Sequence, residues 1–384
     1  MPPGRGVATM SAVFLAVREM RRALVRFALL VLAVALLVFL ILTQQALQDG
    51  LLTSFVGGIR NQSAPVLVYS VDGQRSLQGS IVAPPLEDAV RATEGVGTAG
   101  RIGQGTFTVE GAGDGASDAA IVGVEVPGLG TPSSLSAGQR PTASGDAVGS
   151  ANDFSVGDEI TVAADGDGTP VRLTVVGLAE DVQLNVTPTL FTDLGTYEAA
   201  VRAANPDATE VLPNAIAVAP AEGVAVDDLV SRLDASSPEA DPLTRDQAAD
   251  ESPGVAQVRQ SFQVIFLLYA LVVPLVTGLF FLIITLQKAR SLTLLRAVGA
   301  RAGVLARSLL VQVVAVVGLG LVVGVALYAP VTQVGLGDLA LRFDPGAVVL
   351  WSVLLLVLGV LSALVAVRRV LRIDPLEATT GGGP

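Results

Sequence analysis

Residues 24–42 read LVRFALLVLAVALLVFLIL, and this stretch decides the class of fold. A helix needs about 20 apolar residues to cross roughly 30 Å of hydrocarbon. Three more apolar runs of that size lie in the last third of the chain, at Val264–Leu286, Leu309–Ala329 and Ala347–Val367. The sequence therefore predicts a polytopic α-helical membrane protein with four transmembrane helices.

The residues after the first run indicate that it stays attached to the chain. A cleaved signal peptide has a shorter apolar core, followed by a cleavage site with small residues. Here the run is followed by Thr43-Gln44-Gln45-Ala46-Leu47, which is a poor cleavage site. We therefore expect an uncleaved membrane anchor.

A polar segment of about 215 residues separates the first run from the second. It holds 30 of the 35 acidic residues of the chain but only 10 of the 24 basic ones. Such an acidic segment does not favour nucleic acid as a partner. Short alternating strand patterns are mixed with helical patterns, so we expect an inserted extracytoplasmic α+β domain.

The clearest pattern in this domain is a hairpin. Its strands are predicted at Glu159–Val162 and Val171–Val175, on either side of the turn residues Asp165-Gly166-Asp167-Gly168. The turn is not a calcium loop, because Pro170 and Val176 stand where that motif needs Gly and Glu. Further strands are predicted at Val66–Val71, Thr106–Val109, Ala119–Val124 and Ala215–Val218, and helices at Leu86–Thr93, Leu194–Ala204 and Val224–Leu233.

The two ends of the domain carry helical patterns that join the membrane runs. Apolar residues recur through Gln44–Ile59, so the first membrane helix is expected to continue as a stalk. Val255–Phe262 predicts a second helix that leads directly into the second span. A short amphipathic helix is one interpretation of residues 1–23, and a simple basic flank is the other.

The basic residues outside the domain predict the orientation. Arg residues precede the first span, five basic residues fill the loop between spans two and three, and Arg368, Arg369 and Arg372 follow span four. Since Lys and Arg accumulate on the cytoplasmic side, both termini and this loop should be cytoplasmic. The large domain is then expected outside a bacterial cell membrane.

Several classes of chemistry are excluded by residue types that the chain lacks. It contains no Cys and no His, and Lys288 is its one lysine, so thiol chemistry, histidine ligands and a phosphate-binding loop are all absent. We predict no catalytic residue, no metal and no bound cofactor. The span centres carry no charged residue, which argues against a self-sufficient ion-coupled transporter.

Two segments near the membrane stand out. The loop between spans two and three forms a short helical pattern, apolar on one side and basic on the other, and Gly299 is placed as its stop. On composition it fits a membrane-surface helix and a peg for a soluble partner equally well. In the third run, Gly320-x-x-x-Gly324 predicts close helix packing, either within one subunit or between two.

These residues resemble the permease subunits of the MacB/FtsX superfamily of ATP-binding cassette (ABC) transporters, and most of all the four-span DevC-like branch. Leu295-Arg296-Ala297-Val298-Gly299-Ala300 is similar to the family signature that enters span three. Ile373-Asp374-Pro375-Leu376-Glu377-Ala378 is similar to its closing motif. Gly157-Asp158-Glu159-Ile160 with Val175-Val176-Gly177 resembles the pattern of MacB-like periplasmic core domains.

The resemblance implies a non-catalytic permease that pairs with a second copy or a related permease, in contact with membrane lipid. ATP would be bound and hydrolysed by a separate ABC ATPase subunit. The helix between spans two and three would be the coupling helix that seats in this ATPase. Its residues are Arg290, Leu292, Leu294, Leu295, Arg296, Val298 and Gly299.

ATP-driven closure would then move the stalks and the external domain, a mechanism called mechanotransmission. The expected role is export of a lipid, lipoprotein, peptide or drug-like substrate, with a periplasmic adaptor as a further partner. The alternative is an FtsX-like regulator of an extracellular cell-wall hydrolase without transport. A membrane-tethered sensor or adhesion module without an ATPase is a third class.

The expected organisation places an FtsX-like permease domain at about residues 263–378. The segments are a cytoplasmic N-terminal segment 1–23, transmembrane helix 24–47, extracytoplasmic MacB-like core domain with stalks 48–262, transmembrane helix 263–286, coupling-helix loop 287–307, transmembrane helix 308–330, short external loop 331–345, transmembrane helix 346–367 and cytoplasmic tail 368–384.

Overall fold

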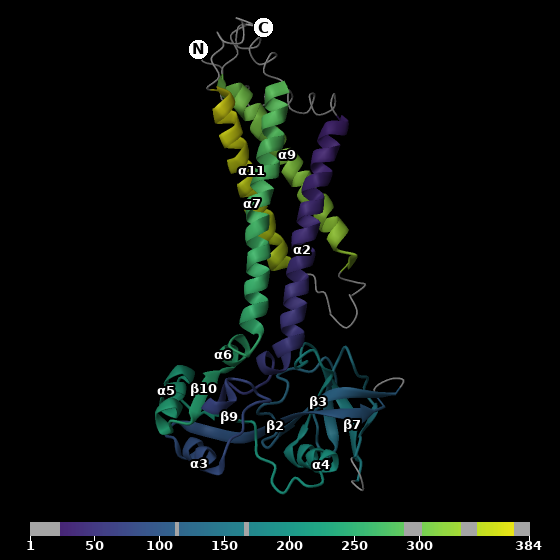
Figure 1. Ribbon diagram of the computed structural model, residues 1–384, viewed down its shortest axis with the longest axis vertical. Helices are drawn as coiled ribbons and strands as arrows, with labels where there is room; N and C mark the ends of the chain where they lie inside the picture. Colours follow the sequence, from purple (N-terminus) through teal and green to yellow (C-terminus); the bar gives the residue numbers. More distant parts are fainter. Residues whose placement is uncertain (1–23, 112–114, 165–168, 288–301, 332–343, 372–384) are drawn as a thin grey trace, which may run out of the picture. The chain divides into compact units, whose positions relative to one another are not determined.

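The computed structural model describes residues 24–111, 115–164, 169–287, 302–331 and 344–371 (Figure 1). The chain divides into two compact units. One contains Met1–Gln48 and Ser261–Pro384, and the other contains Asp49–Gln260. The described residues of the first unit are helical, whereas the second unit is built around a mixed β-sheet.

Four long helices run through the helical unit, and two of them continue into the second. They are α2 (Leu24–Arg60), α7 (Val255–Gln287), α9 (Ala302–Tyr328) and α11 (Pro345–Leu371). In the described residues, three stretches are long and apolar enough to cross a membrane: Leu24–Arg60, Val255–Val272 and Leu310–Tyr328. The apolar part of α11, Pro345–Leu361, is shorter. The apolar helices are thus confirmed, and the count of four spans stays a prediction.

Small residues bring α9 against α2. An added Cβ at Gly320 would lie 2.5 Å from Cγ1 of Val34, and one at Gly324 would lie 2.6 Å from Cβ of Val38. Neither position can therefore accept a larger side chain without a shift of the helices. The structure places both glycines against α2 of the same chain.

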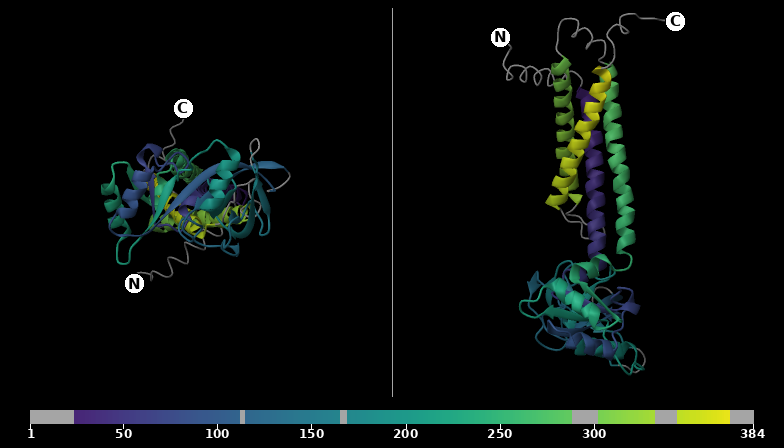
Figure 2. Two further views of the ribbon diagram at one scale, coloured as in Figure 1. Left: turned by 90° about the horizontal axis from the view of Figure 1, so that it is seen from below. Right: turned by 90° about the vertical axis from the view of Figure 1, so that its left-hand side faces the viewer.

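The other helices of this unit also meet through specific side chains. Trp351 of α11 donates from Nε1 to Oε1 of Gln45 in α2, at 3.3 Å. Its ring packs on Phe266 of α7, with 5.0 Å between the ring centroids. Figure 2 shows α9 and α11 side by side, and Gly359 of α11 lies against Val317 of α9.

The second unit contains a sheet of ten strands with the order β10-β1-β9-β2-β3-β8-β5-β7-β4, and β6 pairs with both β2 and β7. The strands are β1 (Val66–Ser70), β2 (Val96–Glu110), β3 (Ala116–Val124), β4 (Ala137–Gly138), β5 (Asp146–Ser150), β6 (Glu159–Val162), β7 (Val171–Ala179), β8 (Thr189–Asp193), β9 (Ala215–Pro220) and β10 (Ala240–Thr244).

The long strand β2 joins the two halves of this sheet. Its first part pairs with β9, and its second part pairs with β3. Helices α3 (Pro84–Ala92) and α5 (Val226–Ser236) pack over the β1–β9–β10 end, and α4 (Leu194–Ala204) packs on β2 and β3 (Figure 1). Two buried apolar clusters lie under these helices, and a third lies between the sheet and the end of α2.

Most of the predicted local elements are confirmed. The hairpin forms with Val162 opposite Val171, and helices occur at Leu194–Ala204 and Val226–Ser236. The first stalk is part of α2, which is unbroken to Arg60. The second stalk is the start of α7.

Strand β2 is much longer than the predicted Thr106–Val109. The prediction was too short because of the glycines in the first part of the strand. Glycine is depleted in strands, so Gly97, Gly100 and Gly103 suppress the strand pattern. The structure needs a glycine at position 103, because a Cβ there would lie 2.1 Å from Cε1 of Tyr197 in α4. The ring of Tyr197 is seated where the side chain would be.

Candidate functional site

The predicted coupling helix lies outside the described residues. This applies to Arg290, Leu292, Leu294, Leu295, Arg296, Val298 and Gly299, to the N-terminal segment 1–23 and to the closing motif at 373–378. The functional geometry that the structure does describe is the place where the domain holds the ends of α2 and α7. All of it lies within Asp49–Gln260.

The end of α2 is fastened to the loop of residues 180–188, which connects β7 to β8 and is named here the docking loop. Three backbone hydrogen bonds of 2.9 Å join them. Gly58 N–H donates to the carbonyl of Gln183, while the N–H groups of Asn185 and Val186 donate to the carbonyls of Phe55 and Ser54. Backbone hydrogen bonds depend strictly on distance and angle, so they fix both the rotation and the height of the helix end.

Two adjacent glycines make this approach possible. A Cβ at Gly57 would lie 2.4 Å from the carbonyl oxygen of Asp181, and one at Gly58 would lie 2.7 Å from Cγ of Leu184. Both distances are shorter than Cβ contacts in real proteins. At Gly57 the helix therefore meets the backbone of the loop directly, and at Gly58 it meets the carbonyl oxygen of Val182 and the side chain of Leu184.

The docking loop has a strained backbone. Asp181, Asn185 and Val186 have positive φ values of 58°, 52° and 59°. This region is unfavourable for a β-branched residue such as Val186, so surrounding contacts must hold it in place. Such contacts include the amide of Gln183, which donates to Asp153 Oδ2 at 2.7 Å, and the hydroxyl of Thr189, which accepts from Leu184 N–H at 3.0 Å.

One carboxylate bridges α2 and α7. Asp250 lies at the end of α6 (Arg245–Asp250), and its Oδ1 accepts from Arg60 of α2 at 2.5 Å and from Arg259 of α7 at 2.8 Å. These side chains are partly exposed, so each pair contributes at most about 1 kcal/mol to stability. Their significance is geometric, because Asp250 ties both helix ends to the same short helix.

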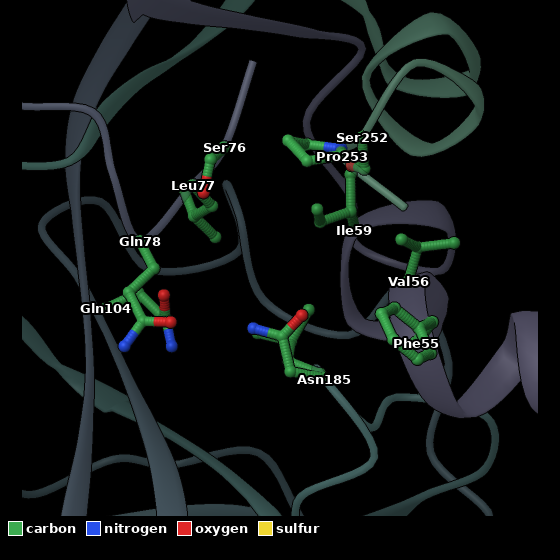
Figure 3. Close-up of a pocket in the computed structure, with 11 residues that line it drawn as sticks. Phe55, Val56, Ile59, Ser76, Leu77, Gln78, Gln104, Asn185, Ser252 and Pro253 are labelled. Atoms are coloured by element: carbon green, nitrogen blue, oxygen red, sulfur yellow. The ribbon is translucent and has the colours of Figure 1, made fainter. Parts of the chain in front are cut away.

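A cavity of about 300 Å³ lies beside the docked end of α2 (Figure 3). Its apolar lining comes from Phe55, Val56 and Ile59 of α2, together with Leu77 and Leu184. Its polar lining comes from Ser76, Gln78, Gln104, Asn185 and Ser252. The neighbouring Arg75 donates to the carboxylates of Asp241 and Glu251, and its hydrogen bond to Asp241 raises the pKa of Arg75. These ion pairs hold the loop around residues 74–79 in place.

The contacts described above hold segments of the domain together. In the described part of the chain, no group of three His, Cys, Asp or Glu side chains could hold a metal ion. What the geometry provides is a mechanical connection. The end of α2 is thus joined to the loop between β7 and β8.

Sequence reasoning located the stalks but missed the docking loop. Gly57-Gly58 near the end of an apolar helical pattern was the available signal, since paired glycines permit close backbone approach. Asn185 could be suspected of a left-handed conformation, but Val186 could not.

No family model matches the chain, and no curated protein matches it. Solved structures that are similar over about half of it include the three that follow. The periplasmic region of MacB from Actinobacillus actinomycetemcomitans has 14% identity, 49% coverage of this chain, 92% coverage of that chain and a TM-score of 0.34. The extracellular domain of the noncanonic ABC-type transporter YknZ from Gram-positive bacteria is 8% identical, with a TM-score of 0.31. This match covers 47% of the present chain and 99% of the YknZ domain.

A domain of a permease protein from Porphyromonas gingivalis is similar at 13% identity, with coverages of 48% and 88% and a TM-score of 0.28.

Proposed function

We propose that the chain is the permease subunit of a bacterial ABC transporter, and that it converts ATP hydrolysis by a separate ATPase subunit into movement of its extracytoplasmic domain. The membrane helices act as shafts in this mechanism, and the substrate does not pass between them. Both termini and the loop 287–307 are cytoplasmic.

The observation that carries the proposal is the way α2 joins the domain. This helix runs without interruption from an apolar stretch long enough to span a membrane to Arg60. Its last turns are held by three backbone hydrogen bonds. A helix that only anchored a domain would not need such a rigid attachment, whereas a helix that transmits movement does.

The second shaft is α7, which enters the apolar stretch directly from Val255. Asp250 contacts Arg259 of α7 and Arg60 of α2, so the two shafts share one attachment. Rigid elements that move together are the usual means of passing a displacement between distant sites.

We propose that the energy comes from a partner, since these 384 residues contain no phosphate-binding loop. The proposed contact is the predicted coupling helix at Arg290–Gly299. A second permease copy, or a related permease, pairs with this chain, and the pair binds two separate ATPase subunits. The proposed role is export of a lipid, lipoprotein, peptide or drug-like substrate.

The test is co-purification of ATPase activity with the tagged full chain from its native membranes. The double variant Leu294→Asp with Arg296→Asp should remove this activity. It places a negative charge on the apolar side of the predicted coupling helix and reverses the sign of a charge on its basic side. The matched control replaces Arg342→Asp in the loop expected on the opposite side of the membrane. The proposal is wrong if the double variant retains the ATPase as well as the control does.

A further inference from the structure

The cavity beside α2 has features of a built binding site rather than a packing defect. Its volume of about 300 Å³ equals roughly ten water molecules in the liquid. It is at the lower end of the range of small-molecule sites. Its walls come from α2, the docking loop, strand β2 and the segment between α6 and α7.

One side chain that lines the cavity has a hydrogen-bond donor without an acceptor in the described part of the chain. The side chain of Gln104 is buried, with 4% of its surface exposed, and its Nε2 has no hydrogen-bond partner in the described part of the chain. A buried donor without an acceptor is costly, so a ligand or water that supplies an oxygen there is favoured. The requirement is specific, because the donor is fixed in a central strand.

The other lining groups define the class of ligand. No Asp, Glu, Lys or Arg lines the cavity, so a charged ligand would lose its hydration without gaining a partner. Gln78, Gln104 and Asn185 offer three side-chain amides, each with donors and an acceptor. A peptide group has the complementary donor and acceptor.

The opposite wall is apolar. Figure 3 shows Phe55, Val56 and Ile59 on one side of the cavity and Gln78 and Gln104 on the other, with Asn185 between them. Phe55, Val56 and Ile59 form a surface suited to one aliphatic group, and Leu184 and Leu77 add to the apolar lining.

We propose that this cavity binds an uncharged peptide segment, with one aliphatic side chain against Phe55, Ile59 and Leu184 and a backbone carbonyl accepting from Nε2 of Gln104. The site does not depend on the proposed ATPase partner. A bound peptide would contact the end of α2 and the docking loop at once.

The experiment uses a single reporter cysteine, since the chain has none of its own. Gly79→Cys places a thiol on an exposed residue next to Gln78 at the rim of the cavity, where an added Cβ makes only ordinary contacts, in the full chain in detergent micelles. The probe is N-acetyl-leucine N-methylamide, and the readout is the rate at which a bulky maleimide modifies the thiol. We expect saturable slowing, half-maximal in the millimolar range for a ligand of this size. A thiol at Glu222→Cys, on an exposed turn away from the cavity, should be unaffected.

Three comparisons sharpen the test. Gln104→Leu should raise the half-maximal concentration about tenfold, and Gln139→Leu, on the exposed surface, should leave it unchanged. Leu77→Trp fills the cavity without altering Gln104 and should abolish the slowing. Zwitterionic leucine should not protect the thiol. The proposal is overturned by equal protection in the Gln104→Leu and Gln139→Leu variants, by equal protection from zwitterionic leucine, or by no protection at 100 mM probe.

Discussion

The replacement Gly57→Ala tests the attachment of α2 most sharply. The new Cβ would lie 2.4 Å from the carbonyl oxygen of Asp181, while real Cβ contacts begin between 3.0 and 3.4 Å. The helix and the docking loop must therefore separate by about 0.6 to 1.0 Å. The bond from Gly58 N–H to Gln183 O, now 2.9 Å, would exceed about 3.5 Å and would no longer be a hydrogen bond.

The change in the free energy of opening the junction is the sum of two opposing contributions. Loss of the three backbone hydrogen bonds costs about 3 kcal/mol in total, at about 1 kcal/mol each. Replacing a helical glycine by alanine favours the helix by about 1 kcal/mol. The expected net loss is about 2 kcal/mol in the free energy that opens the junction, which corresponds to about a 30-fold increase in amide exchange.

Hydrogen exchange read by mass spectrometry measures this directly in the full chain. Peptides that contain Asn185 and Val186 should exchange about 30-fold faster, while the β6–β7 hairpin should not change. The matched control is Gly318→Ala in α9, where an added Cβ meets no atom within 4 Å. If Gly57→Ala leaves the exchange of the docking loop at the control rate, the junction does not depend on close backbone contact and the reasoning fails.

Three further predictions concern other contacts. Asp250→Asn should weaken the attachment of both stalks slightly, by at most about 1 kcal/mol because the pairs are partly exposed, and the exchange of residues 55–60 would rise less than tenfold; a larger rise would contradict the surface-pair estimate. Gly320→Val should lower the thermal stability of the detergent-solubilised chain because the side chain meets Val34, whereas Gly318→Val should cost much less; equal losses would refute the α2–α9 contact. The backbone N–H groups of Thr142 and Ala143 donate to Asp146 and lower its pKa. The stabilisation from Asp146 is therefore present above the ordinary pKa of aspartate and is lost as pH falls through the lowered pKa. Asp146→Asn should flatten the acid limb of unfolding followed by circular dichroism, and an unchanged acid limb would refute the assignment.

The sequence predicts those parts of the structure that depend on local pattern. The hairpin at Glu159–Val175 follows from alternation and turn residues, and the length of α2 follows from apolar residues that continue past the membrane run. Patterns of this kind are read within a few neighbouring residues. The predicted elements form in the folded protein because their apolar faces are also the faces that become buried.

Other parts are determined by contacts that are distant in the sequence. Strand β10 contains Pro242, and a proline in a segment argues against predicting a strand there. The structure tolerates this proline because β10 lies at the edge of the sheet. The junction joins Gly58 to Gln183, and Val186 is held in a backbone conformation that its own preference opposes. Gly57-Gly58 indicates that some backbone comes close, but no local pattern tells which loop it is, so the partner could be identified only from the structure.

The central claim is that ATP hydrolysis in a partner moves the extracytoplasmic domain through α2 and α7. The most direct measurement compares hydrogen exchange in the complex of the chain with its ATPase, reconstituted in lipid nanodiscs, with ADP and with a trapped ATP state. The account predicts that peptides covering residues 54–60 and 181–187 change their exchange with nucleotide, while the β6–β7 hairpin does not. An actively hydrolysing complex whose docking loop exchanges identically in both nucleotide states would contradict it.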